Sequence, residues 1–355
     1  MLAWAHANGS FPHHYRDEST GKPVDLLKYP QANCYDTPAQ GSPWFQRYPL
    51  DAAGNNILGG GMVAQQAHFV EMSYVAYQAT GDLGILENVQ YNANYTILCD
   101  AIQSTPKAAI IHGEYRGVAW AFRNLFMAHA ATLDAEARGD LPDSCHPSSY
   151  WKKLLDNQLT YYSKFMSDPN QTLWRLVGAD GMWGPWQHDY MMVALAFGVL
   201  TGHSDWTPLY LWALGNVIAR TSGTSGFPPG YGTPYYMGVG PNGTTSPRFK
   251  NWAEAFEEIK NSANPNIHYA ALTQAAYDGL KADPLNGGKA FVGHEYLLTT
   301  RAALITADYL DKKGLANVRA MYPELNICLA NVQRMFLAGG WVNPRASVIS
   351  RTKGT

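Results

Sequence analysis

The sequence is poor in charge and has no long apolar run. Only 15% of its 355 residues are charged, and the formal net charge is −2. No segment clusters lysine and arginine to neutralise a run of phosphates, so we expect no nucleic-acid partner. A membrane span needs about 18–20 consecutive apolar residues. The longest candidate, 191–200, ends at once in Thr201, Gly202 and His203, so we expect no membrane insertion.

Signals that would fix a compartment are also missing. The N-terminus has no basic segment followed by an apolar stretch, which indicates either that export is absent or that a removed segment preceded residue 1. We therefore expect a soluble protein and leave its compartment open, with an extracellular or periplasmic location among the choices.

Cysteine is scarce, and its spacing argues against a metal centre. Cys34, Cys99, Cys145 and Cys328 lie far apart and form no Cys-x-x-Cys pair. Thiolate ligation of zinc or of an iron–sulfur cluster is therefore disfavoured, and buried free thiols are expected, with disulfides left open. Histidine, aspartate and glutamate are scattered without ligand spacing, so no metal and no cofactor is expected.

Several catalytic motifs are missing as well. The chain has no Gly-x-Ser-x-Gly elbow, no Gly-x-x-x-x-Gly-Lys-Ser/Thr loop, no His-Glu-x-x-His helix and no Gly-x-Gly-x-x-Gly after a predicted strand. Each of these motifs places a nucleophile, a phosphate, a zinc ion or a dinucleotide in a defined way. Their absence disfavours serine hydrolases, nucleotide-phosphate enzymes and dinucleotide-binding enzymes.

Apolar and aromatic residues, by contrast, are plentiful. Apolar residues make up 46% of the chain, which holds 11 Trp, 22 Tyr and 12 Phe, enough for a large core. Residues 1–60 contain many Gly and Pro breakers and little helical periodicity, so we expect an extended, irregular arm that wraps the helical body. A helical domain is expected over 61–340, followed by a C-terminal tail over 341–355.

Helical periodicity begins at Met62, where Val63, Ala67, Val70 and Tyr74 recur at three- and four-residue steps. The same kind of spacing returns along the rest of the chain. It predicts helices over about 62–80, 84–104, 117–137, 148–166, 187–201, 206–221, 265–280, 292–312 and 315–335.

Two kinds of connection join these helices. The turn at 80–82 is tight, with Gly81 suited to a left-handed C-cap and Asp82 to the N-cap of the next helix. Residues 201–205 repeat this hairpin device. Other connections, such as 222–250, are long and rich in Gly, Pro and aromatics, which is typical of a lid or rim over a cleft. Repeated hairpins without a capping repeat favour a closed, all-α α/α toroid.

One cluster of candidate site residues opens the helix expected near 117. Arg116, Trp120 and Arg123 share a helical face by their four- and three-residue spacing, next to Glu114 and Tyr115. A face of this kind suits a cleft for polar, including acidic, ligands, because buried guanidinium groups need acceptors. The alternative is a set of structural Arg–carboxylate bridges between hairpins.

A second cluster opens the helix expected near 187. Trp183 and Trp186 offer flat apolar faces that stack on sugar rings, while His188, Asp189 and Tyr190 supply proton-transfer and hydrogen-bonding groups. The alternative is that Asp189 caps the helix and both Trp residues pack in the core. His68, within the helix expected over 62–80, and His268, at the start of the helix expected over 265–280, are weaker candidates for the same cleft.

Hairpins with Trp, His, Asp and Tyr at inner-helix starts resemble the six-hairpin α/α-toroid carbohydrate-active enzymes, both glycoside hydrolases and polysaccharide lyases. The arm motif His-x-Arg-Asp-Glu-x-Thr-Gly at 14–21 is also similar to that of a group of bacterial and phage proteins. The toroid resemblance implies an oligosaccharide or polysaccharide as partner. It implies substrate contacts from Trp183, Trp186, Arg116, Trp120, Arg123, Tyr115, His68 and His268.

The resemblance leaves two mechanisms open. A hydrolase needs two carboxyl groups flanking the scissile bond, for which Asp189 and Glu114 are the expected pair, with Asp180 and Glu71 in reserve. A lyase would take the proton next to a uronate carboxylate with His188, Tyr190 or Tyr115, while Arg116 neutralises that carboxylate.

The hydrolase is placed slightly ahead of the lyase, because toroid hydrolases are more numerous. A non-catalytic glycan-binding or assembly module is a third hypothesis. A toroid that holds a prenyl chain or a peptide is a fourth.

Overall fold

A computed structural model of the protein describes residues 14–30, 32, 71–98, 115–174, 182–233, 237–241, 248–261 and 294–338. These residues are mostly helical, and the strands among them form one antiparallel pair, β1 (Met182–Trp183) with β2 (Met237–Gly238). The all-α class is therefore confirmed. No helix in the described ranges combines the length and the apolar character needed to cross a membrane.

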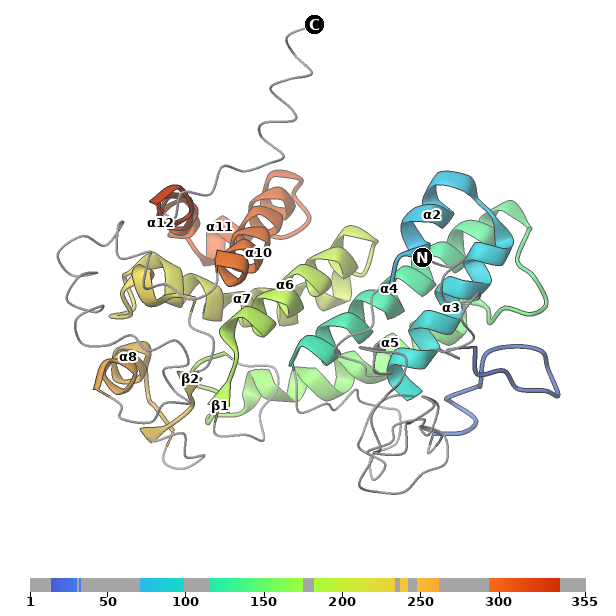
Figure 1. The fold of residues 1–355 in the computed structure, drawn as a ribbon, viewed down its shortest axis with the longest axis horizontal. Coiled ribbons are helices and arrows are strands. Elements are labelled where there is room, and N and C mark those ends of the chain that lie inside the picture. The colour runs from blue at the N-terminus through green and yellow to red at the C-terminus, as the bar shows by residue number, and fades with distance from the viewer. Residues whose placement is uncertain are drawn as a thin grey trace, which may run out of the picture. The chain divides into compact units, whose positions relative to one another are not determined.

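The chain divides into two compact units, which we describe separately (Figure 1). The first unit comprises Met1–Lys164 and Thr201–Trp206, and the second comprises Phe165–Leu200 and Thr207–Thr355. Closure of the predicted hairpins into one ring stays a prediction.

Helical hairpins build the first unit. Its helices are α2 (Ser73–Thr80), α3 (Leu83–Leu98), α4 (Tyr115–Arg138) and α5 (Ser148–Tyr162), and α3 and α5 both lie against α4. Trp206, at the end of the short η4 (Ser204–Trp206), inserts edge-on between Phe122 and Phe126 of α4, with ring centroids 5.2 and 5.1 Å away. These rings are fully buried and form the core of the unit.

The turn between α2 and α3 follows the predicted capping chemistry. Gly81 has a φ of 66° and donates its N–H to the Tyr77 carbonyl at 2.7 Å. The Asp82 carboxylate accepts from the backbone N–H groups of Gly84 (2.8 Å) and Ile85 (3.1 Å). Both predicted caps are confirmed.

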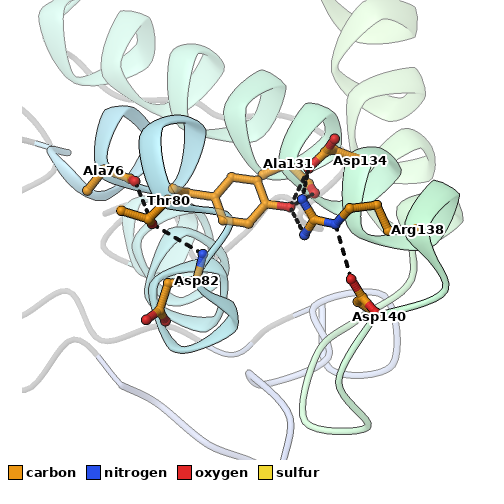
Figure 2. A network of polar contacts seen from close by, with 8 residues as sticks. Ala76, Thr80, Asp82, Ala131, Asp134, Arg138 and Asp140 are labelled. Atoms are coloured by element: carbon orange, nitrogen blue, oxygen red, sulfur yellow. Dashed lines mark hydrogen bonds and ion pairs between the residues drawn. The ribbon is translucent and has the colours of Figure 1, made fainter.

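Polar contacts at this corner tie α2 to the end of α4. Arg138 donates to Asp134 at 2.8 Å and to Asp140 at 3.2 Å (Figure 2). The Tyr77 hydroxyl of α2 lies 2.7 Å from the same Asp134 carboxylate. The α2–α3 hairpin is thereby fixed on α4 at the end far from Trp120.

Residues 14–30 of the predicted arm form no helix and lie on α3 and the start of α5. The backbones of Arg16 and Pro23 form an isolated antiparallel β-bridge, and Arg16 Nε donates to the Tyr91 hydroxyl at 2.9 Å. The Leu26 N–H donates to the Tyr150 hydroxyl at 2.9 Å. This segment is therefore part of the first unit.

A second group of helices builds the other unit. They are α6 (Pro185–Leu200), α7 (Thr207–Ser222), α8 (Trp252–Asn261), α10 (His294–Lys312), α11 (Val318–Met321) and α12 (Leu325–Ala338). Helix α10 lies against α6 and α12, and α12 also lies against α7. The short η5 (Pro229–Tyr231) follows α7 and contacts it.

Three predicted helices need correction. The continuous helix expected over 315–335 is wrong, because Pro323 cannot continue a helix and keeps Tyr322 extended (φ −131°, ψ 80°), which separates α11 from α12. The helix expected from 62 begins, in the described part, only at Ser73. The helix expected over 148–166 ends at Tyr162 and continues as a 3₁₀ turn, η3 (Ser163–Ser167).

Helix α8 was not predicted, and the helix expected over 265–280 lies outside the described residues.

Candidate functional site

The predicted site residues fall into two sets. Arg116, Trp120 and Arg123 belong to the first unit, whereas the residues from Trp183 to Tyr190 belong to the second. The prediction that both sets line one cleft involves residues of both units, and it stays a prediction. Outside the described residues lie Glu114, His68, His268 and Asp180, together with the side chain of Tyr115.

Asp189 lies in a fully buried ion pair of the second unit. Its carboxylate accepts from Arg220 of α7 and from the Thr300 hydroxyl of α10. Arg220 is also fully buried, donates to Asn216 Oδ1 at 2.9 Å and reaches the Gly232 carbonyl. The pair thus joins α6, α7, α10 and the loop after η5.

Burial and pairing act in opposite directions on these two groups. Burial raises the pKa of Asp189 and lowers the pKa of Arg220, and the contact between them opposes both shifts. The Asp189 carboxylate is thus buried and already accepts from two protein donors, as is usual for a buried ion pair within a fold. The prediction of Asp189 as a catalytic carboxylate finds no support in this geometry, and its partner is Arg220 rather than a helix terminus.

The neighbours of Asp189 are also packed inside the second unit. His188 is fully buried with Nε2 3.0 Å from the Ala213 carbonyl, and its ring meets Trp183 edge-on at 6.0 Å. Trp183 and Trp186 are only 2% and 5% exposed, and Trp186 meets Tyr190 edge-on at 5.8 Å. These indole faces contact protein, which agrees with the alternative that both Trp residues belong to the core.

The first unit holds the set that does reach the surface. Along α4, the half-exposed positions recur at steps of four and three residues, whereas the positions between them are buried. Arg116, Trp120 and Arg123 lie on this stripe, as their spacing predicts, and Met127 and Ala130 continue it. We call the part formed by Arg116, Trp120 and Arg123 the α4 face.

Among the described residues, an aromatic ring and an amide hold Arg123 on this face, and no anion does. Its guanidinium lies 4.4 Å from the centre of the Trp120 ring, a cation–π contact. Its Nε and one Nη donate to Asn124 Oδ1 at 3.1 and 3.0 Å. Within the described ranges, no carboxylate comes within ion-pair distance of Arg123. The described residues thus show no Arg–carboxylate bridge at Arg123, and the alternative of such a bridge stays open.

Burial lowers the pKa of Arg123 to about 10, and the negative charge of Glu71 opposes this shift through space. Glu71 is itself 8% exposed and accepts three hydrogen bonds. They come from the backbone N–H groups of Ser73 (2.6 Å) and Tyr74 (3.0 Å) and from Asn92 Nδ2 (2.9 Å). Glu71 thus caps α2, and its charge acts on Arg123 without direct contact.

Asn124 and Asn92 complete this site and were not predicted from the sequence. Asn124 is buried and orients Arg123 through Oδ1, and its Nδ2 finds no acceptor in the part of the chain that the structure describes. The available signal was a carboxamide directly after Arg123 at a core position of a helical pattern, where a polar group needs a partner.

A buried histidine pair lies elsewhere in the first unit. His203 Nε2 is 3.1 Å from His129 Nδ1, and burial lowers the pKa of both rings, that of His203 to about 4. The part of the chain that the structure describes contains no group of three His, Cys, Asp or Glu side chains able to hold a metal. Cys145 and Cys328 are buried free thiols, as predicted for these two.

Comparison with models of known families, with curated proteins and with solved structures finds no match. Any functional conclusion therefore rests on the chemistry of the α4 face.

Proposed function

We propose that the protein binds an oligosaccharide or polysaccharide on the α4 face. The observation that carries the proposal is the half-exposed Trp120–Arg123 pair, in which the guanidinium has no carboxylate partner among the described residues. A flat indole supplies the apolar surface on which a sugar ring stacks. Guanidinium N–H groups supply donors for hydroxyl and ring oxygens.

The energetic cost of this arrangement supports a role in binding. A partly desolvated cation without an anion destabilises a protein unless something compensates it. We therefore take the Trp120–Arg123 pair as a feature retained for a ligand.

Catalysis is a separate question. Hydrolysis requires two carboxyl groups roughly 5–10 Å apart, and of the expected pair Asp189 is engaged by Arg220 while Glu114 lies outside the described residues. The hydrolase hypothesis therefore receives no support from Asp189. The lyase hypothesis does not use Asp189, and the binding proposal does not depend on it either.

Calorimetric titration with a panel of neutral and acidic oligosaccharides tests the binding proposal. Trp120→Ala should weaken binding of the best ligand about tenfold or more, which corresponds to about 1.4 kcal/mol. Tyr309→Ala is the matched control, because Tyr309 is an exposed aromatic residue of α10 in the other unit, and it should leave affinity unchanged. The proposal fails if no sugar in the panel binds, or if Trp120→Ala binds like the wild type.

The same mixtures show whether turnover accompanies binding. Hydrolysis raises the number of reducing ends, whereas elimination also produces an unsaturated uronate that absorbs in the ultraviolet. Binding without either signal identifies a non-catalytic module.

A further inference from the structure

We propose that the segment Thr201–Trp206 responds to acid: it lies on α4 near neutral pH and leaves α4 when a pair of histidine side chains becomes charged. The proposal does not depend on glycan binding. In the chain this segment joins α6 to α7, and by its contacts it belongs to the first unit. We call it the docked turn. It brings two buried side chains to α4, Trp206 and His203, which are 0% and 3% exposed.

Ring contacts hold the docked turn on α4. Trp206 lies edge-on between Phe122 and Phe126, and Phe126 also meets the His203 ring at 5.0 Å. The indole Nε1 of Trp206 is buried and finds no acceptor in the described ranges. The Trp206 backbone N–H donates to the His203 carbonyl at 3.1 Å, which links the two residues within the turn. Aromatic rings do not titrate in this way, so any response to pH has to come through His203.

His203 forms a hydrogen-bonded pair with His129 of α4. Its Nε2 lies 3.1 Å from His129 Nδ1, and the ring centroids are 4.7 Å apart. A hydrogen bond between two imidazoles needs one protonated nitrogen and one free lone pair. A first extra proton keeps the bond but buries a charge, and a second sets two N–H groups against each other. Burial accordingly lowers the pKa of both rings.

The charged groups around this pair come from α4, from α5 and from the docked turn itself. Lys152 of α5 opposes protonation of both rings, whereas Asp156 of α5 and Asp205 of the turn favour it. Glu136 of α4 favours protonation of His129. Lys152 pairs with Asp156 and, at 3.3 Å, with Asp205. Solvent reaches all four of these side chains and screens their charges, so the burial of the rings dominates.

The direction of the response follows from proton linkage. Once the turn leaves α4, both rings are uncovered and titrate near their ordinary pKa of 6.5, whereas the docked His203 has a pKa of about 4. Docking is therefore complete near neutral pH and is lost as the pH falls below about 6.5. The released turn leaves up to two more protons bound, so the ratio of released to docked turn should rise by up to about a hundredfold for each pH unit.

Fluorine NMR of the whole chain, with 5-fluorotryptophan in place of tryptophan, tests the proposal. Trp206→Phe and Trp151→Phe assign the two signals, and Trp151 is a fully buried residue of α5. Between pH 7 and pH 4.5 the Trp206 signal should pass to a solvent-exposed position with a slope approaching two protons, while the Trp151 signal keeps its folded position. His203→Gln leaves one titrating ring and should lower the slope to one proton at most. His146→Gln is the matched control, because buried His146 contacts the Pro23 carbonyl, and it should leave the transition unchanged.

Three results would overturn the proposal. The first is a Trp206 signal that keeps its buried position down to pH 4.5. The second is a Trp151 signal that moves together with it, because the first unit then unfolds as a whole. The third is a wild-type slope in His203→Gln. If His203→Gln is not folded at pH 7, as judged by its Trp151 signal, His129→Gln takes its place with the same expected slope.

Discussion

Two arginine side chains of this protein differ in what their surroundings offer them. Arg220 is fully buried and meets Asp189, Asn216 and a backbone carbonyl, so its donors are used inside the protein. Arg123 is half-buried and meets an aromatic ring and one amide oxygen. The first arrangement stabilises a fold, and the second is suited to a ligand.

Removing the buried partner should therefore be costly. Arg220→Met leaves the Asp189 carboxylate buried without its cation, and we expect a loss of about 3–5 kcal/mol in the free energy of unfolding, measured with urea. Lys152→Met is the control, because Lys152 forms exposed pairs with Asp156 and Asp205 and should cost under about 1 kcal/mol. Equal losses in the free energy of unfolding would show that the buried Asp189–Arg220 pair stabilises the protein no more than an exposed ion pair does.

The buried histidine pair should make stability depend on pH. His203 has a folded pKa of about 4 against an ordinary value of 6.5, because burial and the neighbouring His129 disfavour its charged form. Between these values the unfolded chain binds more protons, so stability is full near neutral pH and falls as the pH drops from about 6.5 toward 4. At roughly 1.4 kcal/mol per pKa unit, the loss is on the order of 3 kcal/mol.

Several charged groups act on this pair. Lys152 opposes protonation of His203, whereas Asp156 and Asp205 favour it, and Glu136 favours protonation of His129. Urea unfolding at pH 7 and pH 5 measures the effect, with His203→Gln as the reference that cannot titrate. A wild-type protein that loses no more stability than His203→Gln over this range would contradict the assignment.

The site was predictable at the level of single residues only where the chemistry is local. The spacing of Arg116, Trp120 and Arg123 fixes a shared helix face, since helical geometry alone decides it. The role of Asp189 depends on Arg220 and Thr300, which lie 31 and 111 residues along the chain. No local pattern in the sequence indicates partners this far away, so the ion pair of Asp189 could not be predicted.

Among the elements, the α2–α3 hairpin depends most visibly on capping. Asp82→Ala removes the acceptor for the first N–H groups of α3, and we expect it to cost about 0.5–2 kcal/mol in thermal or urea unfolding. Asp82→Asn keeps a side-chain oxygen at the same place and should retain most of the stability. The capping role is contradicted if the Ala and Asn variants are equally stable.

The same scale explains what the sequence could and could not predict about the fold. Gly81 and Asp82 mark a turn by their own backbone and side-chain chemistry, and the turn was predicted correctly. Pro323 is an equally local signal for the break between α11 and α12, but the helical periodicity continues on both sides of it and predicts one helix. Helix α8 spans less than three turns, too short for periodicity to distinguish it from a loop.

For the whole molecule, the decisive question is which residues have to act together. The catalytic hypothesis from the sequence combined Arg116 with His188, which fall in different compact units. The closure of hairpins into a ring depends on contacts between distant segments, and local periodicity carries no information about it. The binding proposal needs only residues of the first unit, from α4 and from the segment that caps α2.

Hydrogen–deuterium exchange of the whole chain, with and without a saturating concentration of the oligosaccharide that binds best in the panel, tests the central claim that the α4 face is the ligand site. We predict that the ligand slows exchange in peptides covering 115–127 and 71–74, and leaves peptides covering 183–190 unchanged. Protection confined to 183–190, with none on α4, would contradict the account.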